Sequence, residues 1–197
     1  MITIRKARME DAEGIYNVYK SSAKVYNHSL TQNYDEIKLN YIKEDVIKPA
    51  LDLGLILVAE NEKEEIVGSF KSYTSPYRTL AHVMSNTTFV SMPNYEGRKA
   101  FVVLINKFFE TIKSEYPHIK YVDGVPHSSN TTAINEYLKV GYKIKGKIEN
   151  KILDTDTKNF DDEIIIIWTN PNFKYEKLLE YHKYCSEYLK NKYSKQL

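Results

Sequence analysis

The sequence predicts a mixed α/β fold in which a mixed β-sheet carries helices on both faces. The expected elements follow the order β-α-α-β-β-β-α-β-α-β-β-α, so strands run together early and alternate with helices later. The length of 197 residues suits one ordinary domain, or one domain with an appendage. Apolar residues make up 42% and charged residues 27%, which is typical of a globular chain and not of a disordered or fibrous one.

The first half of the chain predicts a strand, two helices and three further strands. These elements are expected at residues 2–7, 10–24, 34–47, 55–60, 66–73 and 81–91. Alternating apolar residues indicate the first strand, and apolar residues at helical spacing indicate the two helices. Asn33 is a plausible N-cap of the second helix, and Pro49 marks its end or a kink. The polar turn at residues 61–65 joins two strands into a hairpin.

The second half predicts alternating helices and strands and ends in a helix. These elements are expected at residues 99–116, 119–125, 131–140, 142–152, 163–168 and 175–192. Gly141 directly follows the helix expected at residues 131–140, where a left-handed C-terminal cap would end it. Pro171 separates the last strand from the final helix.

Composition excludes several classes of protein. A single cysteine, Cys185, excludes an internal disulfide and a Cys-based zinc site, and no metal is expected. The longest apolar run, residues 53–59, is far shorter than the roughly 20 residues of a membrane-spanning helix, and the N-terminus does not resemble a secretory signal. The formal charge of +2 is too small to indicate a nucleic-acid partner. We therefore expect a cytoplasmic protein with neither a nucleic-acid nor a membrane partner.

The segment VSMPNYEGRKAF, residues 90–101, is the first candidate site. A strand, a polar turn with Pro93 and Gly97 and then a helix N-terminus form a potential anion site, because free backbone N–H groups and the positive end of the helix dipole meet there. Arg98 and Lys99 add positive charge. Many strand-to-helix turns share these features, so this segment alone leaves phosphate binding open.

A second segment, residues 123–147, adds a strand, a capped short helix and another strand. Together the two segments resemble the GNAT superfamily of N-acetyltransferases. Pro93, Tyr95 and Gly97 match that family's acetyl-CoA loop, roughly V-x-P-x-Y-R-G-x-G-x-G/A. The later family motif, roughly N-x-x-A-x-x-x-Y-x-x-x-G-F, is matched at Asn130, Ala133, Tyr137, Gly141 and Tyr142. The resemblance covers residues 2–173 and implies a mostly antiparallel sheet flanked by helices, with residues 174–197 as a C-terminal helical extension.

The resemblance implies an enzyme that transfers an acetyl group from acetyl-CoA to a primary amine of a small molecule, such as an amino acid or a polyamine-like compound, by direct attack in a ternary complex. The first motif departs from the family at Glu96, Lys99 and Phe101, where an Arg or Gln and two glycines are usual. Those glycines allow close approach of the backbone to a pyrophosphate. A catalytically degenerate GNAT-like module, which binds CoA or another ligand weakly or not at all, is the alternative.

The resemblance also implies roles for individual residues. Tyr137 takes the position of the general acid that protonates the leaving thiolate, and a backbone N–H near Ser91 or Met92 takes that of the oxyanion donor. His127 follows the fifth strand and is the candidate general base, with Glu60 a weaker one. The expected cofactor-binding residues are Ser91, Met92, Gly97, Arg98, Lys99, Ala100, Phe101 and Asn130, with the pyrophosphate on the N–H groups of residues 97–101.

Residues of the first two helices and the fourth strand are expected to border the acceptor. The candidates are Tyr26, His28, Tyr41 and His82. For each of them, ordinary packing is the alternative interpretation.

The final helix carries an apolar stripe that includes Leu178, Leu179, Cys185 and Leu189. Such a stripe indicates docking on its own domain or on a second chain, so the protein is expected to be a monomer or a homodimer. A basic membrane-surface helix is disfavoured because the polar face also carries three glutamates.

Overall fold

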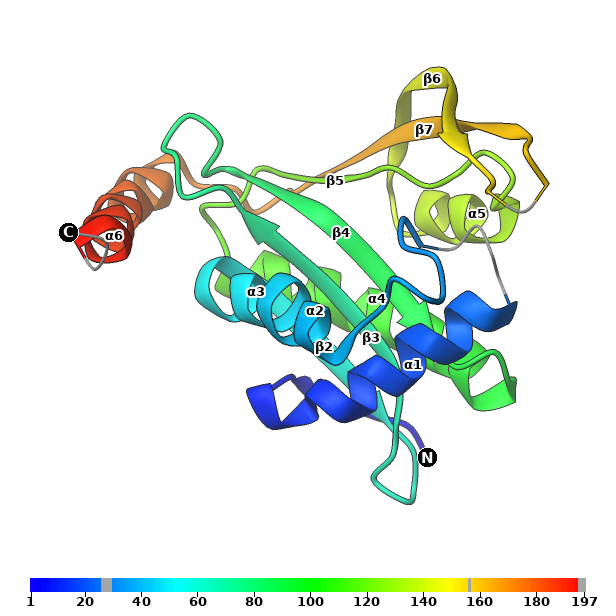
Figure 1. Cartoon of the computed structure of the whole chain (residues 1–197). Coiled ribbons are helices and arrows are strands. Elements are labelled where there is room, and N and C mark those ends of the chain that lie inside the picture. Colours follow the sequence, from blue (N-terminus) through cyan, green and yellow to red (C-terminus); the bar gives the residue numbers. More distant parts are fainter. Residues whose placement is uncertain (26–29, 156, 195–197) are drawn as a thin grey trace.

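The computed structural model describes residues 1–25, 30–155 and 157–194. Within these residues, seven strands form one sheet in the order β1-β2-β3-β4-β5-β7-β6 (Figure 1). Neighbouring strands run antiparallel except β4 and β5, which are parallel. The mixed and mostly antiparallel sheet expected from the sequence is therefore confirmed.

The described strands are β1 Thr3–Lys6, β2 Gly54–Glu60, β3 Ile66–Thr74, β4 Val83–Ser91, β5 Tyr121–Gly124, β6 Lys143–Leu153 and β7 Phe160–Thr169. The described helical elements are η1 Met9–Asp11, α1 Ala12–Val25, α2 Leu39–Tyr41, η2 Ile42–Ile47, α3 Lys48–Leu53, α4 Tyr95–Glu115, α5 Thr131–Lys139 and α6 Tyr175–Ser194. Every expected element is present, and the largest differences lie at both ends of the second helix and at the start of α4.

The second expected helix, residues 34–47, is placed differently in the structure. Asn33 does not cap it: its carbonyl accepts the backbone N–H of Glu36 in a turn. The helical backbone begins at Leu39 and continues through α2, the π-helix η2 and α3 as far as Leu53. Pro49 therefore lies inside the helical run. Because a proline ring crowds the carbonyl four residues earlier, the wider π-helical backbone before it suits its presence.

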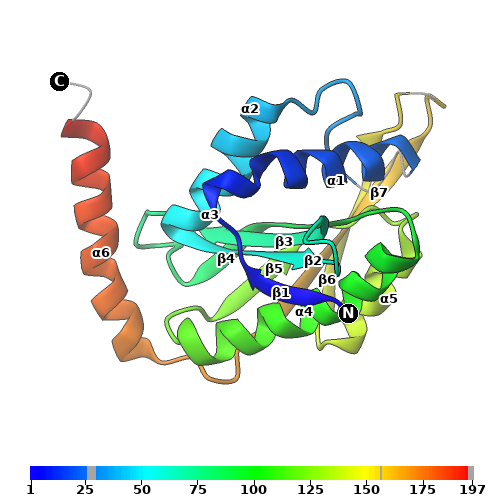
Figure 2. The same cartoon turned by 90° about the horizontal axis from the view of Figure 1, so that it is seen from below.

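Helices cover both faces of the sheet (Figure 2). On one face, α1 and η2 bury Ile15, Val18 and Ile42 against Ile56 and Val58 of β2. On the other face, α4 buries Leu104 and Phe108 against strand residues that include Phe70 and Met84. Burial of these side chains, at about 1.5–3 kcal/mol each, supplies the main stabilisation of the fold.

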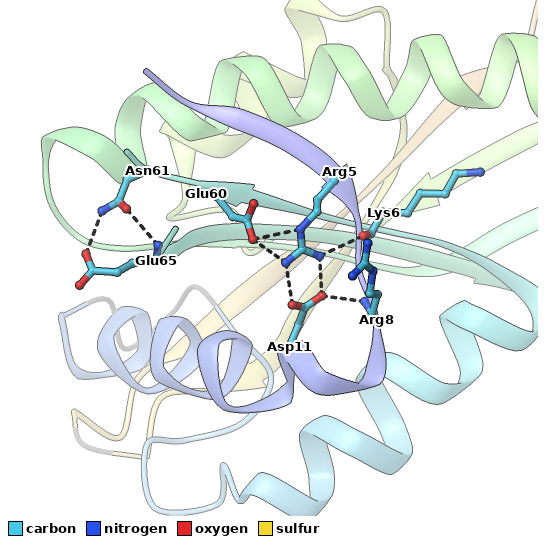
Figure 3. Close-up of polar contacts among 7 residues, drawn as sticks. All are labelled: Arg5, Lys6, Arg8, Asp11, Glu60, Asn61 and Glu65. Atoms are coloured by element: carbon cyan, nitrogen blue, oxygen red, sulfur yellow. Dashed lines mark hydrogen bonds and ion pairs between the residues drawn. The ribbon is translucent and has the colours of Figure 1, made fainter. Parts of the chain in front are cut away.

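A charged cluster fixes the corner where β1, β2 and η1, the turn directly before α1, meet (Figure 3). The Arg5 guanidinium donates to both carboxylate oxygens of Asp11 at 2.7 Å, and its Nε donates to Glu60 at 2.9 Å. Although partial burial raises it, the pKa of Asp11 lies below its usual value because of hydrogen bonds from Arg5 and Arg8. Glu60, the weaker candidate base, is held by Arg5 in this structural ion pair.

The strands β4 and β5 separate soon after they begin. They pair only at Val83–Tyr121 and Met84–Val122, although β4 continues to Ser91. Before Ser91, β4 contains a bulge, where Asn86 has a φ of 55°. Asparagine tolerates this left-handed conformation better than most residues, so the sequence permits a bulge there. The result is a V-shaped opening in the middle of the sheet.

The helix α6 packs against its own chain. Leu178 and Cys185 are buried with Ala81, and the ring of Tyr181 stacks on His118 with centroids 3.9 Å apart. Only part of the apolar stripe is covered, since Leu179 is 48% exposed. The division of the chain after residue 173 stays a prediction.

Candidate functional site

The separation of β4 and β5 opens into a groove of about 1290 Å³. One half is bordered by the ends of β4 and β5, the start of α4 and the helix α5. The other half is bordered by α1, residues 30–32, Tyr41 and Asp45, with Lys71 and Tyr73 of β3. Segments far apart in the sequence therefore meet at one site.

Four of the residues predicted to bind the cofactor line this groove: Ser91, Arg98, Phe101 and Asn130. Phe101 stands where the family motif has a glycine, and its ring meets Phe89 edge-on with centroids 4.2 Å apart. Asn130 caps α5 by accepting the backbone N–H of Ala133 at 3.2 Å. Arg98 is exposed, so its charge is available at the start of α4.

The other four predicted cofactor residues lie elsewhere. Ala100 is fully buried in the core beneath α4. Lys99 is exposed and borders a smaller hollow of about 510 Å³. Gly97 packs so closely on Met92 that a Cβ at residue 97 would lie 1.9 Å from the Met92 carbonyl oxygen. Gly97 is thus needed for packing of the turn on the helix.

The start of α4 differs from the expectation, and the difference changes the anion site. The helix begins at Tyr95, four residues before Lys99, with Asn94 as its N-cap. Asn94 Oδ1 accepts the N–H of Gly97, and the Asn94 carbonyl accepts the N–H of Arg98 at 3.1 Å. The N–H groups beyond them lie within the helix, where each donates four residues back. In this structure the N–H groups of residues 97–101 therefore have partners within the chain, which does not favour the expected placement of a pyrophosphate on them; that placement stays a prediction.

Backbone donors do face the groove from β4. The N–H of Met92 donates to the Val67 carbonyl at 2.9 Å, so it is not the oxyanion donor. Because hydrogen-bonding direction alternates along a strand, the N–H groups of Phe89 and Ser91 point away from β3 and toward the opening. They have no strand partner there, since β5 pairs with β4 only at Val83 and Met84. Two N–H donors are thus available to a carbonyl oxygen in the groove.

Tyr137 lies on α5 and borders the groove although it is only 8% exposed. Its ring lies 5.2 Å from the ring of Tyr142 and 6.5 Å from that of Phe101, measured between centroids. Burial raises the pKa of Tyr137 well above the ordinary value. The phenol is therefore a protonated donor throughout the neutral range.

His127 and Asp123 both border the groove near the end of β5. His127 is half-buried in the loop before α5, where its carbonyl accepts the N–H of Asn130. Asp123 accepts a hydrogen bond from the Ser85 hydroxyl at 2.8 Å, across the point where β4 and β5 part. Burial raises the pKa of Asp123 above its usual value, and the Ser85 hydrogen bond opposes that rise. A carboxylate with a raised pKa is suited to accept a proton.

The predicted acceptor residues separate into three cases. Tyr41 borders the groove. Tyr26 and His28 lie outside the described residues. His82 is not brought to the groove: it precedes β4 at the end far from Ser91, where its ring meets that of Tyr121. The register of β4, which the sequence did not fix, decides this placement.

Two groove residues were not singled out from the sequence. Lys71 is a buried lysine in a strand, and Asp123 ends a strand beside the opening. Lys71 interrupts the apolar pattern of β3, and this could have indicated a functional residue. A single charged residue in a strand, however, more often marks the side that faces solvent. For Asp123, only the three-dimensional separation of β4 and β5 reveals its position.

Within the part of the chain that the structure describes, no cluster of three His, Cys, Asp or Glu side chains is arranged to hold a metal ion. None of the helices formed by the described residues is long and apolar enough to span a membrane.

The architecture is that of known acetyltransferases. A GNAT-family acetyltransferase from Streptococcus pneumoniae superposes with a TM-score of 0.74 at 17% identity, covering 86% of this chain and 99% of that one. A ribosomal-protein-alanine N-acetyltransferase from Brucella melitensis gives 0.71 at 15% identity, covering 85% and 99%. A GNAT phosphinothricin acetyltransferase from Sinorhizobium meliloti, in complex with acetyl-CoA, gives 0.75 at 11% identity, covering 88% and 90%.

In sequence, no protein-family model and no curated protein matches the chain. The structural likeness therefore shows the fold: this chain has the GNAT fold that its two motifs indicated.

Proposed function

We propose that the chain is an acetyl-CoA-dependent N-acetyltransferase that acetylates a primary amine of a small molecule. The observation that carries this proposal is the pair of N–H groups at Phe89 and Ser91, which open into the groove near the buried phenol of Tyr137. The same groove has a second half that an amine can enter beside Tyr41. The fold shared with acetyltransferases, one of them in complex with acetyl-CoA, supports the same assignment.

In the proposed reaction the neutral amine attacks the thioester carbonyl directly in a ternary complex. The carbonyl oxygen becomes an oxyanion, which the N–H groups of Phe89 and Ser91 stabilise. The C–N bond forms, the C–S bond breaks, and Tyr137 gives its proton to the leaving thiolate. The tyrosinate that this transfer leaves then regains a proton from solvent, which restores the phenol for the next turnover.

A base must accept the proton that the amine loses. His127, the candidate from the sequence, borders the groove, and Asp123 is a second candidate that the fold adds. We favour Asp123 because Ser85 holds its carboxylate at the point where the strands part. Substitutions Asp123→Asn and His127→Gln distinguish the two: the variant that lacks the base loses the acidic limb of the pH–rate profile, and the other keeps it.

We place the phosphates of acetyl-CoA near Arg98 and the N–H groups of residues 95 and 96 in the first helical turn. The next two N–H groups, of Gly97 and Arg98, donate to Asn94 Oδ1 and to the Asn94 carbonyl. This arrangement also favours the alternative function, a degenerate module with weak or absent CoA binding. The observation in its favour is the carboxylate of Glu96 beside the helix N-terminus, where Asn61 holds it at 3.2 Å.

Calorimetric titration with acetyl-CoA separates the two functions. For the enzyme we expect saturable binding that weakens when Arg98 is replaced by Gln and is unchanged in Lys113→Gln, a lysine toward the other end of the same helix. Absence of binding at millimolar acetyl-CoA would favour the degenerate module. We further propose that the protein works in the cytoplasm as a monomer or homodimer, without nucleic-acid or membrane partners.

A further inference from the structure

The acceptor half of the groove holds a buried cation. Lys71 of β3 is only 5% exposed, although lysine is among the residue types that are least often buried. Its Cα is paired with Ile56 of β2 and with Thr88 of β4. Since directly opposite residues share a face, Lys71 lies on the α1 face with Ile56, which belongs to the apolar core beneath α1.

This cation has little to balance its charge. Among the described residues, no carboxylate lies within ion-pair distance of Lys71 Nζ. Its near contact is the face of the Tyr73 ring, whose centroid lies 4.9 Å away. A buried charge is costly unless it is paired, and a cation–π contact replaces only part of its hydration. Burial accordingly lowers the pKa of Lys71 to about 8.

The surroundings of Lys71 are those of a ligand site. Lys71, Tyr73, Tyr41 and Asp45 all border the groove. Asp45 lies in the π-helix η2, and Tyr41 ends α2 directly before it. Irregular π-helical turns are frequently found at functional sites. Asp45 is exposed and borders the groove together with Lys71, and its negative charge opposes the fall in the pKa of Lys71 that burial causes. The groove therefore presents a buried positive charge and, beside it, a negative one.

We propose that Lys71 determines acceptor specificity by pairing with a carboxylate of the amine substrate, so that the enzyme takes amines of the amino-acid class and rejects polyamines. A carboxylate supplies the counter-charge that the fold leaves out. A polyamine would place a second cation against Lys71, which like-charge repulsion disfavours. The negative charge of Asp45, in the same groove as Lys71, would repel a second carboxylate. It therefore favours a substrate with one carboxylate and an amino group over a dianion.

This inference rests on the proposed function in one respect, that the bound amine is the acceptor of an acetyl group. Its test measures binding and does not need acetyl transfer. The probes are a set of L-α-amino acids, the matching amines that lack the carboxylate, and 1,4-diaminobutane. Binding is measured by thermal shift and calorimetry at pH 7, on the chain alone and with coenzyme A present. The variants are Lys71→Met, Lys71→Arg and, as a matched control, Lys43→Met, an exposed lysine of η2 that does not border the groove.

We expect at least one amino acid to bind the wild type more tightly than its decarboxylated partner. Lys71→Met should weaken that binding roughly 10- to 100-fold, the range for a charge-assisted hydrogen bond. Lys71→Arg should keep most of the preference for the carboxylate, and Lys43→Met should behave as wild type. Equal binding by wild type and Lys71→Met, tighter binding of the carboxylate-free amines, or no binding of any probe would overturn the proposal.

The two proposals fail separately. Lys71-dependent binding of an amino acid without any acetyl transfer would contradict the proposed function and leave this inference standing. Acetylation of carboxylate-free amines at the same rate by wild type and Lys71→Met would support the proposed function and contradict this inference.

Discussion

Asn94 and Gly97 are joined by a hydrogen bond in which Asn94 Oδ1 accepts the backbone N–H of Gly97 at 2.9 Å. This bond starts α4 at Tyr95 and removes one of the donors that a phosphate would otherwise find at a helix N-terminus. The same glycine rests on the carbonyl of Met92. The turn before α4 is therefore held by its own residues before any ligand binds.

Gly97→Ala tests this packing. A Cβ at residue 97 would lie 1.9 Å from the Met92 carbonyl oxygen, so the turn must shift. We expect a loss of at least about 2 kcal/mol in the free energy of unfolding, the cost of overpacking a rigid site. Gly146→Ala is the matched control, because its Cβ would make an ordinary contact at 3.6 Å. Chemical denaturation of both variants measures the difference, and equal stabilities would contradict the account.

Tyr137→Phe tests the proposed acid. The variant lacks the proton that the thiolate needs, so turnover should fall roughly 100-fold or more. Acetyl-CoA affinity and melting temperature should stay close to wild type. Tyr142→Phe is the control, since Tyr142 is a buried neighbour of Tyr137. Turnover is followed by the release of free thiol; if both variants kept wild-type turnover, Tyr137 would be a packing residue only.

Lys71 gives the stability of the protein a particular pH dependence. In the folded chain its pKa is about 8, against 10.5 for an ordinary lysine. Between these values the unfolded chain holds a proton that the folded chain has released, so this group adds stability as the pH rises through that window. Below pH 8 the burial penalty remains in full.

Lys71→Met should therefore be more stable than wild type at pH 7, by up to about 3 kcal/mol. The difference should shrink steadily between pH 8 and 10.5. Comparing the two proteins at each pH cancels the titration of Tyr41, Tyr73 and Tyr19 nearby. Urea denaturation across this range provides the measurement, and a difference that is constant with pH would show that Lys71 has an ordinary pKa.

His118 makes the docking of α6 sensitive to acid. Burial under the stacked ring of Tyr181 lowers the pKa of His118 to about 4, from an ordinary value of 6.5. Between these values the unfolded or undocked state binds a proton that the docked state does not, so docking weakens as the pH falls from 6.5 toward 4.

Cys185 reports this undocking because it lies on α6 and is buried in the contact between α6 and the rest of the chain, which includes Ala81. Lowering the pH from 7 to 5 should speed Cys185 labelling by a dithiodipyridine, a reagent whose own protonation offsets the smaller fraction of thiolate at low pH. His118→Gln should remove that acceleration, whereas His182→Gln on α6 should retain it. Labelling that is equally fast in wild type at both pH values would argue against acid-dependent docking.

Much of the fold could be predicted because its signals are local. Alternation marked the strands, and apolar spacing marked α1, α4 and α6. The start of α4 was misplaced because Gly97 suggested a loop, although Asn94 three residues earlier is a strong N-cap. The start of the second helix was misplaced for the opposite reason: Asn33 resembles a cap but heads a turn.

The candidate site was only partly predictable because it depends on contacts between distant segments. Tyr137 and Asn130 carry a motif with fixed spacing, so the sequence alone identified them. Lys71 and Asp123 carry none: their roles follow from the separation of β4 and β5 and from the π-helix that brings Asp45 to the groove. His82 was placed in the site because the strand register was not known.

Acetyl transfer itself is the most direct test of the central claim. Wild-type protein is incubated with acetyl-CoA and the panel of amino acids and matching amines, and the products are identified by mass spectrometry. The account predicts an N-acetylated amino acid formed in step with free CoA, and about 100-fold less of it with Tyr137→Phe. Saturable binding of acetyl-CoA with no acetylated product from any amine in the panel would contradict it.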